Sequence, residues 1–368
     1  MGNKVIRFGI VGCGYFGGGF ARILHEMAHT KVVAVHGGSG KSAKSVAAEI
    51  GCEYVEHLEQ LIDRDDVDAV IVASPNHAHK EPVLLAACYG KHVFCEKPVA
   101  LTLADCQEMI DACKKAGVLF MAGHIMHFIP GMEQVKRWVA EGKIGRPIVW
   151  HSERTGWEKP RGEVSWKKMQ QLSGGHLFHH IHELDMALSI MGPAHTVYMA
   201  ADNLAHRGSG YGDEDDVLLM TLRFASGSFG TLQYGSGFRW GEHYIKINGT
   251  EGAIKIDFKQ SRIELQTEGQ KMMRFGLFGE PFDEERREFY RHTDGGVAYG
   301  DLKSRLPNFL RHNMTREISY FCDVINGRAI DEEKKPLFDG TAAIRSVATA
   351  EAALASSKMR QVTQIRNG

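Results

Sequence analysis

Long hydrophobic runs are absent from this sequence of 368 residues. A membrane-spanning helix needs about 20 consecutive apolar residues, and no stretch of the chain reaches that length. The first residues, MGNKVIRFGIVG, lead directly into a predicted strand and lack the pattern of a signal peptide. We therefore expect a cytoplasmic protein without a membrane partner.

A surplus of charge of one sign is also absent. Lys and Arg number 44 against 45 Asp and Glu, which leaves a formal net charge of -1 at pH 7. Nucleic acids and anionic membranes attract strongly basic proteins, so this balance gives no reason to expect either as a partner. With 43% hydrophobic and 24% charged residues, the chain can bury a large core, and its length predicts two domains.

The seven cysteines lack the spacing of a disulfide framework or a zinc ribbon. Six of them lie in the first third of the chain, among predicted strands and helices, and we expect most to be small buried hydrophobic residues. These six are Cys13, Cys52, Cys88, Cys95, Cys106 and Cys113.

The stretch around which the chain is organised reads VIRFGIVGCGYFG and begins at Val5. Its apolar part predicts a buried strand, and Gly12, Gly14 and Gly17 follow at the spacing G-x-G-x-x-G. In a dinucleotide site these glycines permit the tight turn, the approach of backbone to a pyrophosphate, and helix packing on the strand. The alternative is a glycine turn without a ligand. We expect Cys13, inside this loop, to be reachable from the cofactor.

The acidic residue that selects NAD is missing. NAD sites carry an Asp or Glu about 20 residues beyond the glycines, where it accepts a hydrogen bond from the ribose 2′-hydroxyl. Here Gly37 stands at that place, and Ser39, Lys41 and Lys44 follow. A 2′-phosphate would meet no repulsion and some positive charge, so the sequence favours NADP over NAD. The alternative is a flexible turn into a helix over residues 43–50.

Two further strands end in polar segments. An apolar strand over residues 68–73 precedes residues 74–77, SPNH, and ligands bind at such carboxyl ends of strands in doubly wound sheets. The next strand ends in Glu96-Lys97-Pro98. A lysine beside a carboxylate at the mouth of a cofactor cleft is suited to polarise or deprotonate a substrate hydroxyl. A surface ion pair is the alternative.

At these residues the chain resembles the Gfo/Idh/MocA oxidoreductases, the family of glucose-fructose oxidoreductase and inositol dehydrogenase. The resemblance extends over essentially the whole chain, and GKHVFCEKP is its most specific motif. Matching segments are GIVGCGYFG, DAVIVASPNHAHKEPVLLAACYGKHVFCEKP, EGKIGRP, HIHELD and NGTEGAIKID. The resemblance implies an α/β Rossmann domain and an α+β domain with an open, mainly antiparallel sheet for substrate binding and oligomer contacts.

The glycine stretch and the resemblance together indicate a nicotinamide cofactor, NAD(P), in the first domain. The candidate cofactor-binding residues are Gly12, Gly14, Tyr15, Phe16, Gly17, Gly37, Ser39, Lys41, Ser74, Pro75, Asn76, His79, Glu96 and Lys97.

A second chemical centre is the segment SGGHLFHHIHELD. On one continuous helix, His176 and His180 stand four residues apart and His179 and His182 three apart, so several imidazoles share a face with the carboxylate of Asp185.

Two other interpretations of this segment stay open. One is a purely structural role for the histidines, and the other is a metal site. We expect no metal, because on a helix the candidate ligands do not all point the same way. Those ligands would be His176, His180, His182 and Glu183.

The resemblance assigns roles within this segment. In the family, the histidine of an H-x-x-D element faces the lysine across the nicotinamide, and His182 and Asp185 match that element. A carboxylate one turn earlier often assists, but Phe178 occupies that place here, which indicates a variant pocket. The candidate catalytic residues are Lys97, His182, Asp185 and His179.

The alternation of strands and helices stops after Gly123. We predict a dinucleotide-binding Rossmann domain over residues 1–123 and a substrate-binding and oligomerisation domain over residues 124–368. Its final helix, expected from Asp339, would pack back on the first domain. Several long strands without intervening helices predict an antiparallel sheet.

Polar and aromatic residues of the second domain are candidates for substrate contacts, because aromatic rings offer flat faces to sugar rings. They are His124, His127, Arg154, Trp157, Trp166, His180, Arg239 and Trp240.

These observations predict an NAD(P)-dependent oxidoreductase that transfers hydride between the cofactor and a secondary hydroxyl of a sugar, polyol or glycoside. The alternative is a glycosidase or epimerase of the same fold that oxidises its substrate transiently and recycles a bound cofactor. A non-catalytic sensor of dinucleotide and ligand is a third hypothesis. The expected partners are a small carbohydrate and, from the resemblance, further copies of the chain in a homodimer or homotetramer.

Overall fold

The computed structural model describes residues 4–38, 40–160, 163–208, 210–292 and 305–366. Ser39, one of the candidate cofactor residues, lies outside them. The chain forms two compact units. Unit 1 comprises Met1–Ile125 and Tyr299–Ala343, and unit 2 comprises Met126–Ala298 and Ile344–Gly368.

Unit 1 contains a six-stranded parallel sheet in the order β3-β2-β1-β4-β5-β6. Its inner strands form because their apolar runs are buried on both faces, and every residue of β4 is buried. The order reverses between β1 and β4, the place where doubly wound sheets bind ligands. The strands are β1 (Ile6–Val11), β2 (Thr30–His36), β3 (Glu53–Tyr54), β4 (Ala69–Val72), β5 (His92–Glu96) and β6 (Phe120–Gly123).

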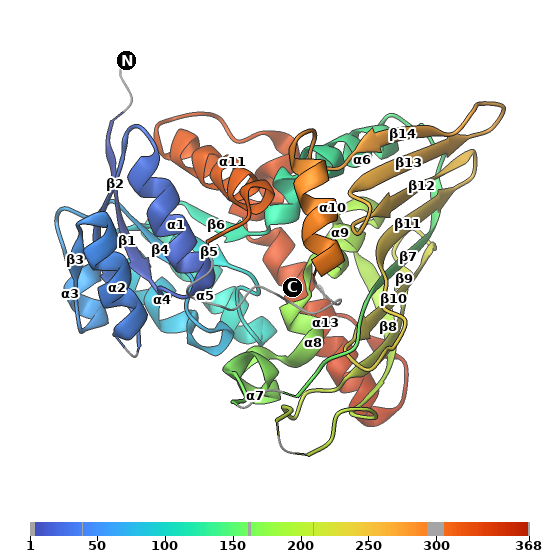
Figure 1. Cartoon of the computed structure of the whole chain (residues 1–368), viewed down its shortest axis with the longest axis horizontal. Coiled ribbons are helices and arrows are strands. Elements are labelled where there is room, and N and C mark those ends of the chain that lie inside the picture. The colour runs from blue at the N-terminus through green and yellow to red at the C-terminus, as the bar shows by residue number, and fades with distance from the viewer. Residues whose placement is uncertain (1–3, 39, 161–162, 209, 293–304, 367–368) are drawn as a thin grey trace. The chain divides into compact units, whose positions relative to one another are not determined.

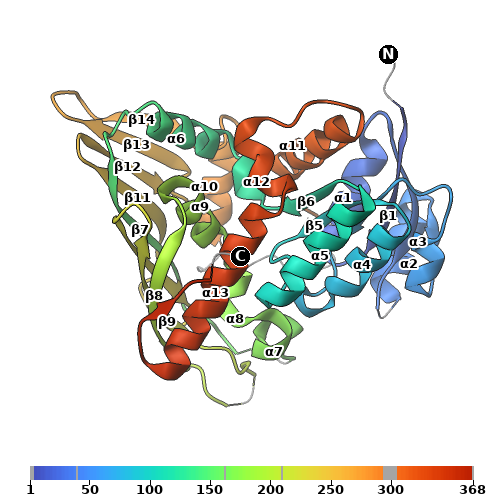
Figure 2. The ribbon, with the colours of Figure 1, turned by 180° about the vertical axis from the view of Figure 1, so that it is seen from behind.

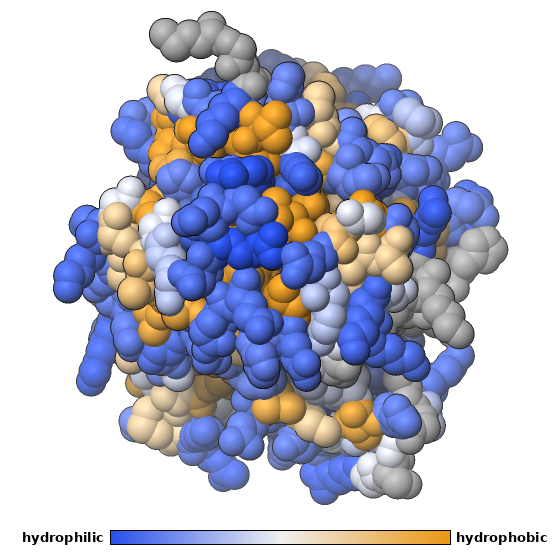
Figure 3. Space-filling model, turned by 90° about the vertical axis from the view of Figure 1, so that its left-hand side faces the viewer, coloured by the Kyte–Doolittle hydropathy of each residue, from blue (hydrophilic) through white to orange (hydrophobic). Residues whose placement is uncertain are grey.

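Helices cover both faces of this sheet. α1 and α2 lie on one face, toward the viewer in Figure 1, and α4 and α5 lie on the other, toward the viewer in Figure 2. The face that carries α2 and α3 is mostly hydrophilic, and hydrophobic side chains occur on it in small groups (Figure 3). The helices are α1 (Tyr15–Glu26), α2 (Lys41–Ile50), α3 (Leu58–Ile62), α4 (Lys80–Cys88) and α5 (Leu103–Ala116), with a 3-10 turn η1 (Asn76–Ala78).

A segment from late in the chain completes unit 1. It contains α11 (Asn308–Ile325), η4 (Glu332–Lys334) and α12 (Lys335–Phe338). Helix α11 packs beside α1, and Phe321 meets Phe94 of β5 with ring centroids 6.0 Å apart. Phe94 also meets Phe20 of α1, with ring centroids 5.1 Å apart. The late segment therefore contributes directly to the core of the parallel sheet.

Unit 2 contains a nine-stranded sheet in the order β14-β13-β12-β11-β7-β10-β9-β8-β15. All neighbours are antiparallel except β7 and β10, which are parallel. The strands are β7 (Pro147–Thr155), β8 (Ala194–Asp202), β9 (Val217–Phe224), β10 (Phe229–Gly235), β11 (His243–Gly249), β12 (Gly252–Asp257), β13 (Arg262–Thr267), β14 (Met273–Gly276) and β15 (Thr363–Gln364).

The helices of unit 2 lie on one face of its sheet, as both ribbon views show. Alternating burial along β9 agrees with this arrangement, because one side of the strand faces the core and the other faces solvent. The elements are η2 (Ile125–Phe128), α6 (Pro130–Ala140), η3 (Trp166–Lys168), α7 (Gln170–Ser173), α8 (Gly175–His179), α9 (His182–Met191), α10 (Phe282–His292) and α13 (Thr341–Met359).

The predicted fold class, an α/β Rossmann domain with a second, open and mainly antiparallel sheet, is confirmed. Two details of the prediction are wrong. The final helix begins at Thr341, because the backbone N–H of Thr341 donates to Asp339 Oδ1 (2.8 Å) after a left-handed Gly340. The histidine segment is not one helix: α8 ends at His179 and α9 starts at His182, with His180 outside the helical region at φ -105° and ψ 35°.

Candidate active site

The glycine loop of unit 1 adopts the conformation that its spacing predicts. Gly12 has φ +90°, and a Cβ added there would overlap the backbone of Ala73 and Ser74. A Cβ on Gly17 would overlap the carbonyl oxygen of Gly12. Both glycines are therefore required by the fold itself, one for the turn at the end of β1 and one for the packing of α1.

Gly14 differs from its two neighbours. Its φ of -72° suits any residue, and a Cβ added there would meet no described atom within 4 Å. The residue stands at the N-cap of α1, where backbone N–H groups and the helix dipole attract anions. Open space before a glycine that the fold does not need fits the close approach of a cofactor pyrophosphate, so the loop suits the dinucleotide.

Cys13 is only 4% exposed, and burial raises the pKa of its thiol to about 12. The expected access from the cofactor is therefore wrong. The broader expectation for the cysteines holds, since five of the seven are buried and all seven are free thiols.

The other candidate cofactor residues gather at the carboxyl ends of the strands of unit 1. His79 is 1% exposed, and its two ring nitrogens each lie 2.9 Å from a carbonyl oxygen, that of Ser74 and that of Pro98. Burial lowers the pKa of His79, and the neutral ring, which has a single N–H, donates to only one of these two carbonyl oxygens. Tyr15, Phe16, Gly37, Lys41, Pro75 and Asn76 lie in α1, at the end of β2, at the start of α2 and around η1.

Glu96 ends β5, and Lys97 follows it directly. The backbone N–H of Lys97 donates to Glu96 Oε2 (3.1 Å), which turns the carboxyl back over the strand end. Burial raises the pKa of Glu96 to about 7, although the charge of Lys97 opposes the rise. Burial therefore favours the protonated form of this carboxyl beside the candidate catalytic lysine.

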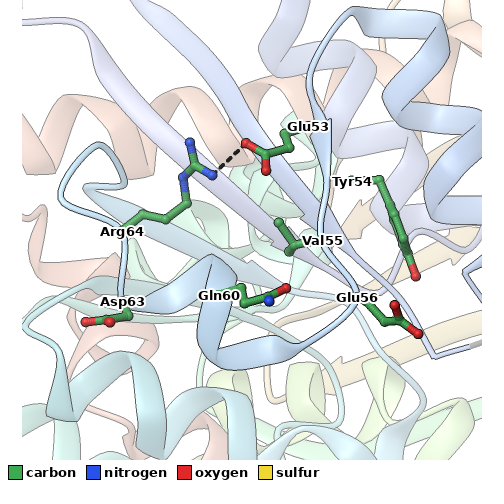
Figure 4. A pocket seen from close by; sticks show the side chains of 7 residues that line it. All are labelled: Glu53, Tyr54, Val55, Glu56, Gln60, Asp63 and Arg64. Atoms are coloured by element: carbon green, nitrogen blue, oxygen red, sulfur yellow. Dashed lines mark hydrogen bonds and ion pairs between the residues drawn. The ribbon is translucent and has the colours of Figure 1, made fainter.

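A hollow of about 570 Å³ lies elsewhere in unit 1, between β3 and α3 (Figure 4). Its cation, Arg64, already pairs with Glu53 (2.7 Å) and with Asp66 (2.7 Å). The other charged side chains that line it are Glu56 and Asp63, so the hollow is acidic and does not suit an anionic cofactor. None of the candidate site residues lines it.

In unit 2 the break between α8 and α9 redirects the histidines. The ring of His180 stacks on that of His176, with centroids 5.4 Å apart and an interplanar angle of 25°. The ring of His179 meets His180 edge-on at 5.0 Å. Three of the predicted imidazoles are thus in contact, although they do not share the face of one helix. His182 is the first residue of α9.

Asp185 is joined to a different histidine from the one expected. His127 Nε2 lies 2.8 Å from Asp185 Oδ2, and both side chains are almost completely buried. Lys136 Nζ lies 3.3 Å from the other ring nitrogen, so the ring of His127 donates from Nε2 to the carboxylate. His127, a predicted substrate contact, thus holds the carboxylate of the H-x-x-D element.

A buried chain of polar groups that the sequence did not reveal lies beside α9. Glu183 Oε1 lies 2.8 Å from His243 Nε2 and 3.4 Å from Arg154 Nη1, and His243 Nδ1 lies 2.8 Å from the hydroxyl of Tyr290. Burial alone raises the pKa of Glu183, but Arg154 and His243 outweigh it and lower the pKa overall. Burial also lowers the pKa of His243 to about 4, so its ring is neutral.

The partners of Glu183 lie 29 and 60 residues away. The one signal in the sequence is Glu183 itself, an acidic residue on the buried side of an amphipathic helix. That signal does not identify the residues with which Glu183 interacts.

The aromatic candidates divide into two kinds. Trp157 lies under the guanidinium of Arg239 at 3.5 Å and beside the ring of His206 at 4.7 Å. Trp240 is 83% exposed, and its indole N–H donates to Glu242 (2.9 Å). Trp166 lies in η3, and His124 follows β6 in unit 1 rather than in the second unit.

Among the residues that the structure describes, no group of three or more His, Cys, Asp or Glu side chains is arranged to hold a metal ion. Two of the four residues considered for a metal have other polar partners. His176 Nε2 lies against Ser236 Oγ (3.2 Å), and Glu183 lies against His243. In the same described ranges no helix is long and apolar enough to cross a membrane.

Comparison with known proteins identifies the class. Residues 6–124 match the family model of the NAD-binding Rossmann fold of the GFO_IDH_MocA oxidoreductases, and residues 136–365 match that of their C-terminal alpha/beta domain. The chain therefore belongs to the Gfo/Idh/MocA oxidoreductase family, and the resemblance in the sequence is confirmed.

Three known proteins illustrate this membership. The chain is 42% identical over 362 residues to the 2,7-anhydro-N-acetylneuraminate hydratase of Escherichia coli, covering 97% of each chain. It is 41% identical over 352 residues to the enzyme of the same name from Mediterraneibacter gnavus, covering 95% of this chain and 94% of that one. A levoglucosan dehydrogenase in complex with NADH and L-sorbose shares the fold, with a TM-score of 0.80, 21% identity and coverage of 98% and 99%.

Proposed function

We propose that this protein is a nicotinamide-dependent hydratase that acts on an anhydro sugar acid of the 2,7-anhydro-N-acetylneuraminate class. In this proposal a secondary hydroxyl is oxidised transiently, and water is added across the internal ether bond. The observation that carries the proposal is the identity of 41% and 42% to two proteins of that name, over nearly the full length of each chain. It develops the internal-redox alternative that the sequence left open.

The chemistry explains why a hydratase would use an oxidoreductase fold. Held at the loop of Gly12, Gly14 and Gly17, a bound nicotinamide would supply reversible hydride transfer at the substrate carbon. A ketone two bonds from an ether carbon acidifies the intervening C–H, so loss of that proton expels the ether oxygen and opens the ring as an enone. Water then adds to the enone, and reduction of the ketone would restore the alcohol. One water is gained, and no net oxidation occurs.

Residues of both units receive roles in this scheme. Lys97 positions and polarises the hydroxyl that is oxidised, and the carboxyl of Glu96 exchanges protons beside it. His182 accepts the hydroxyl proton, directly or through His179. Asp185, held by His127, orients the start of α9. These assignments stay predictions until tested.

The substrate and cofactor contacts are proposed on the same basis. Trp157 and Trp166 would offer flat faces to the sugar. Arg154, His124 and His180 would supply polar contacts. For the cofactor, no carboxylate stands at position 37, which supports acceptance of NADP as well as NAD.

We also propose that unit 1 is the cofactor domain and unit 2 the substrate and oligomerisation domain. Assembly as a homodimer or homotetramer and a cytoplasmic location remain predictions.

A net dehydrogenase is the second candidate. It is favoured by 29% identity over 303 residues to the myo-inositol 2-dehydrogenase of Thermotoga maritima, and by the intact lysine and H-x-x-D elements. In that case the ketone would be the product, and reduced cofactor would accumulate with it.

One experiment separates the candidates. The purified protein is mixed with NAD⁺ or NADP⁺ and 2,7-anhydro-N-acetylneuraminate in H₂¹⁸O, and reduced-cofactor absorbance is followed together with sugar mass. N-acetylneuraminate that carries one ¹⁸O, without net cofactor reduction, supports the hydratase. Oxidised sugar in equal amount to reduced cofactor contradicts it, and an unchanged sugar excludes this substrate class. A parallel panel of polyols tests the dehydrogenase.

A further inference from the structure

An arginine and a tryptophan stack on each other at one edge of the sheet of unit 2, and we call this pair the Trp157–Arg239 stack. The central guanidinium carbon of Arg239 lies 3.5 Å from the centre of the Trp157 ring. At this separation the guanidinium lies flat on the indole, because its nitrogens would overlap the ring if the group stood edge-on. A flat guanidinium keeps its N–H groups in a plane parallel to the ring, where they can donate to a planar anion.

The backbone on both sides of the stack is fixed. Trp157 lies just after β7 and Arg239 just after β10, and because these strands are parallel, both residues leave the sheet at the same edge. Trp157 pairs with Gly237 as an isolated antiparallel bridge, and the backbone N–H of Phe238 donates to the carbonyl oxygen of Gly156 (2.9 Å). The stack therefore joins two segments whose relative position is set by the strand register.

The indole is also held from a second direction. His206 is 3% exposed, and its ring lies beside that of Trp157 with centroids 4.7 Å apart. The backbone N–H of His206 donates to Asp216 Oδ2 (2.7 Å), and the ring of Tyr211 contacts the ring of His206 at 4.7 Å. The indole is thus a fixed support for the guanidinium.

The stack lies next to the histidine segment. Helix α8, which carries His176, packs against β10. Ser236, which precedes Arg239 in the same loop, has its Oγ 3.2 Å from His176 Nε2 and 3.5 Å from His206 Nδ1. His176 in turn stacks on His180. Ser236 therefore connects the loop of the stack with a histidine that we place beside the substrate.

Two other cations beside this segment are already paired with carboxylates of the fold. Arg154 Nη1 lies 3.4 Å from Glu183 Oε1. Lys168 Nζ lies 2.8 Å from Glu158 Oε2 and 2.8 Å from Glu214 Oε1. An anionic ligand that approached either cation would be repelled by these carboxylates.

Arg239 differs from these two cations. Among the residues that the structure describes, no carboxylate lies within ion-pair distance of its guanidinium, and the side chain is exposed. The nearest acid along the chain, Glu242, accepts from the indole N–H of Trp240 (2.9 Å) and lies 3.9 Å from Lys259 Nζ. Arg239 therefore presents a positive charge that the described carboxylates do not compensate, on a fixed support beside the histidines.

We propose that Arg239 binds the carboxylate of the sugar acid through two of its N–H groups and thereby makes the site selective for acids over neutral sugars. The inference rests on the proposed function, in which the substrate is a sugar acid. Trp157 supports the guanidinium, and the indole face that Arg239 covers is closed to the sugar ring. Arg239 is a specificity-determining residue, since it contacts the carboxylate and takes no part in the hydride and proton steps.

The first test reads the site without turnover. The Nε–H signal of Arg239 in the full-length protein is identified by its loss in Arg239→Gln, and acetate or acetamide is added at constant ionic strength. We expect acetate to shift the signal and acetamide, its neutral isostere, to leave it unchanged.

Arg223 provides the internal control for this test. Its guanidinium also lies over a ring, that of Phe229 at 5.5 Å, on the exposed side of β9 and β10. Its signal, identified by its loss in Arg223→Gln, should respond less to acetate because it is not held against the ring as closely. No acetate shift at Arg239, or equal shifts at the two arginines, would overturn the inference.

The second test uses a matched pair of ligands. KM and kcat are measured for 2,7-anhydro-N-acetylneuraminate and for its uncharged methyl ester. In Arg239→Gln, KM for the acid should rise roughly 30-fold, the effect of one hydrogen bond between charged groups. Its kcat should stay nearly constant, because the carboxylate keeps its charge throughout the reaction. KM for the ester should stay at the wild-type value, and Arg223→Gln should leave both KM values unaltered.

The outcomes distinguish this inference from the proposed function. If Arg239→Gln hydrates the acid with the KM of wild type, Arg239 does not bind the carboxylate, and the proposed function stands. Equal rises of KM for acid and ester would also refute the inference, since they would indicate a general change of the loop. If the wild type leaves the anhydro sugar unchanged while acetate still shifts the Arg239 signal, the proposed function is rejected and the carboxylate site stands.

Discussion

The glycine loop of unit 1 and the histidine segment of unit 2 are built in opposite ways. The loop relies on backbone: residues 12–17 meet the ends of neighbouring strands, and its key residues have no side chains. The histidine segment relies on side chains that come from far along the sequence, such as His243, 60 residues from Glu183. The glycine loop depends on residues that lack side chains. The histidine segment depends on several buried charged side chains that must all be present.

This difference predicts different sensitivities. In the loop, a methyl group added at Gly12 or Gly17 should disrupt the fold. A methyl group added at Gly14 should leave the fold intact and affect only ligand binding. In the histidine segment, a change of one charge leaves its partners buried and unpaired, so stability and pH dependence change together.

The largest effect is expected at Lys97, where the two regions are proposed to act on one substrate. Lys97→Ala should lower turnover about 10³-fold, because it removes the group that polarises the hydroxyl. Cofactor affinity should change little, since the glycine loop is intact. Stopped-flow turnover and fluorescence titration with reduced cofactor measure the two quantities. Lys114→Ala, an exposed change on α5, serves as the control. Undiminished turnover in Lys97→Ala would remove Lys97 from the chemistry.

The second prediction concerns pH and His243. Because burial holds its pKa at about 4 in the folded protein, below the value of 6.5 in the unfolded chain, the unfolded state binds more protons between these values. Stability is complete above pH 6.5 and falls as the pH drops toward 4. In His243→Gln this part of the fall should vanish, a difference of roughly 3 kcal/mol between pH 7.5 and 4.5.

Urea unfolding at four pH values measures this difference. His25→Gln, a change at an exposed residue of α1, should leave the pH dependence of wild type unaltered. Parallel curves for wild type and His243→Gln would show that the ring is not buried as a neutral group.

The third prediction separates two glycines of one loop. Gly14→Ala should weaken cofactor binding about 30-fold by blocking the pyrophosphate, an effect of the size of one charge-assisted hydrogen bond. The melting temperature without cofactor should stay unchanged, because the added Cβ meets no described atom within 4 Å. Gly12→Ala should instead cost about 1–3 kcal/mol of folding free energy through its positive φ. Equal melting temperatures for the two variants would contradict the distinction.

The smallest effect is expected at position 37. Gly37→Asp restores an acid at the end of β2, where the nearest described atom to an added Cβ is Ala43 Cβ at 3.4 Å. Affinity for NADP should fall by roughly tenfold relative to NAD through charge repulsion. Titration of both cofactors against the wild type and the variant measures the ratio. An unchanged ratio would mean that the 2′-position lies away from residue 37.

The same contrast explains how far the sequence predicted the structure. Several strands and helices of unit 1, such as β1, β4 and α2, were predictable because each is set by a local apolar run between turn residues. The expected single helix over residues 176–185 was wrong because spacing alone assumes a continuous helix, whereas the chain turns at His180 and sends His176 toward Glu214.

The polar partners could not be predicted. Glu214, Lys168 and His243 were ordinary polar residues in the sequence, and only the strand register and the loops bring them to the histidines. Asp185 was recognised through its motif, but its bond to His127 spans 58 residues and leaves no local signature.

The late segment of unit 1 also has a consequence for synthesis of the chain. Phe321 and Leu306, which cover Phe94 and Gly19, leave the ribosome only after the whole nine-stranded sheet except its last short strand. A nascent chain that ends near residue 125 therefore carries the complete phosphate-binding motif on an unfinished hydrophobic core. Unit 1 therefore completes its core only after most of unit 2 has been translated, although its glycine motif is translated first.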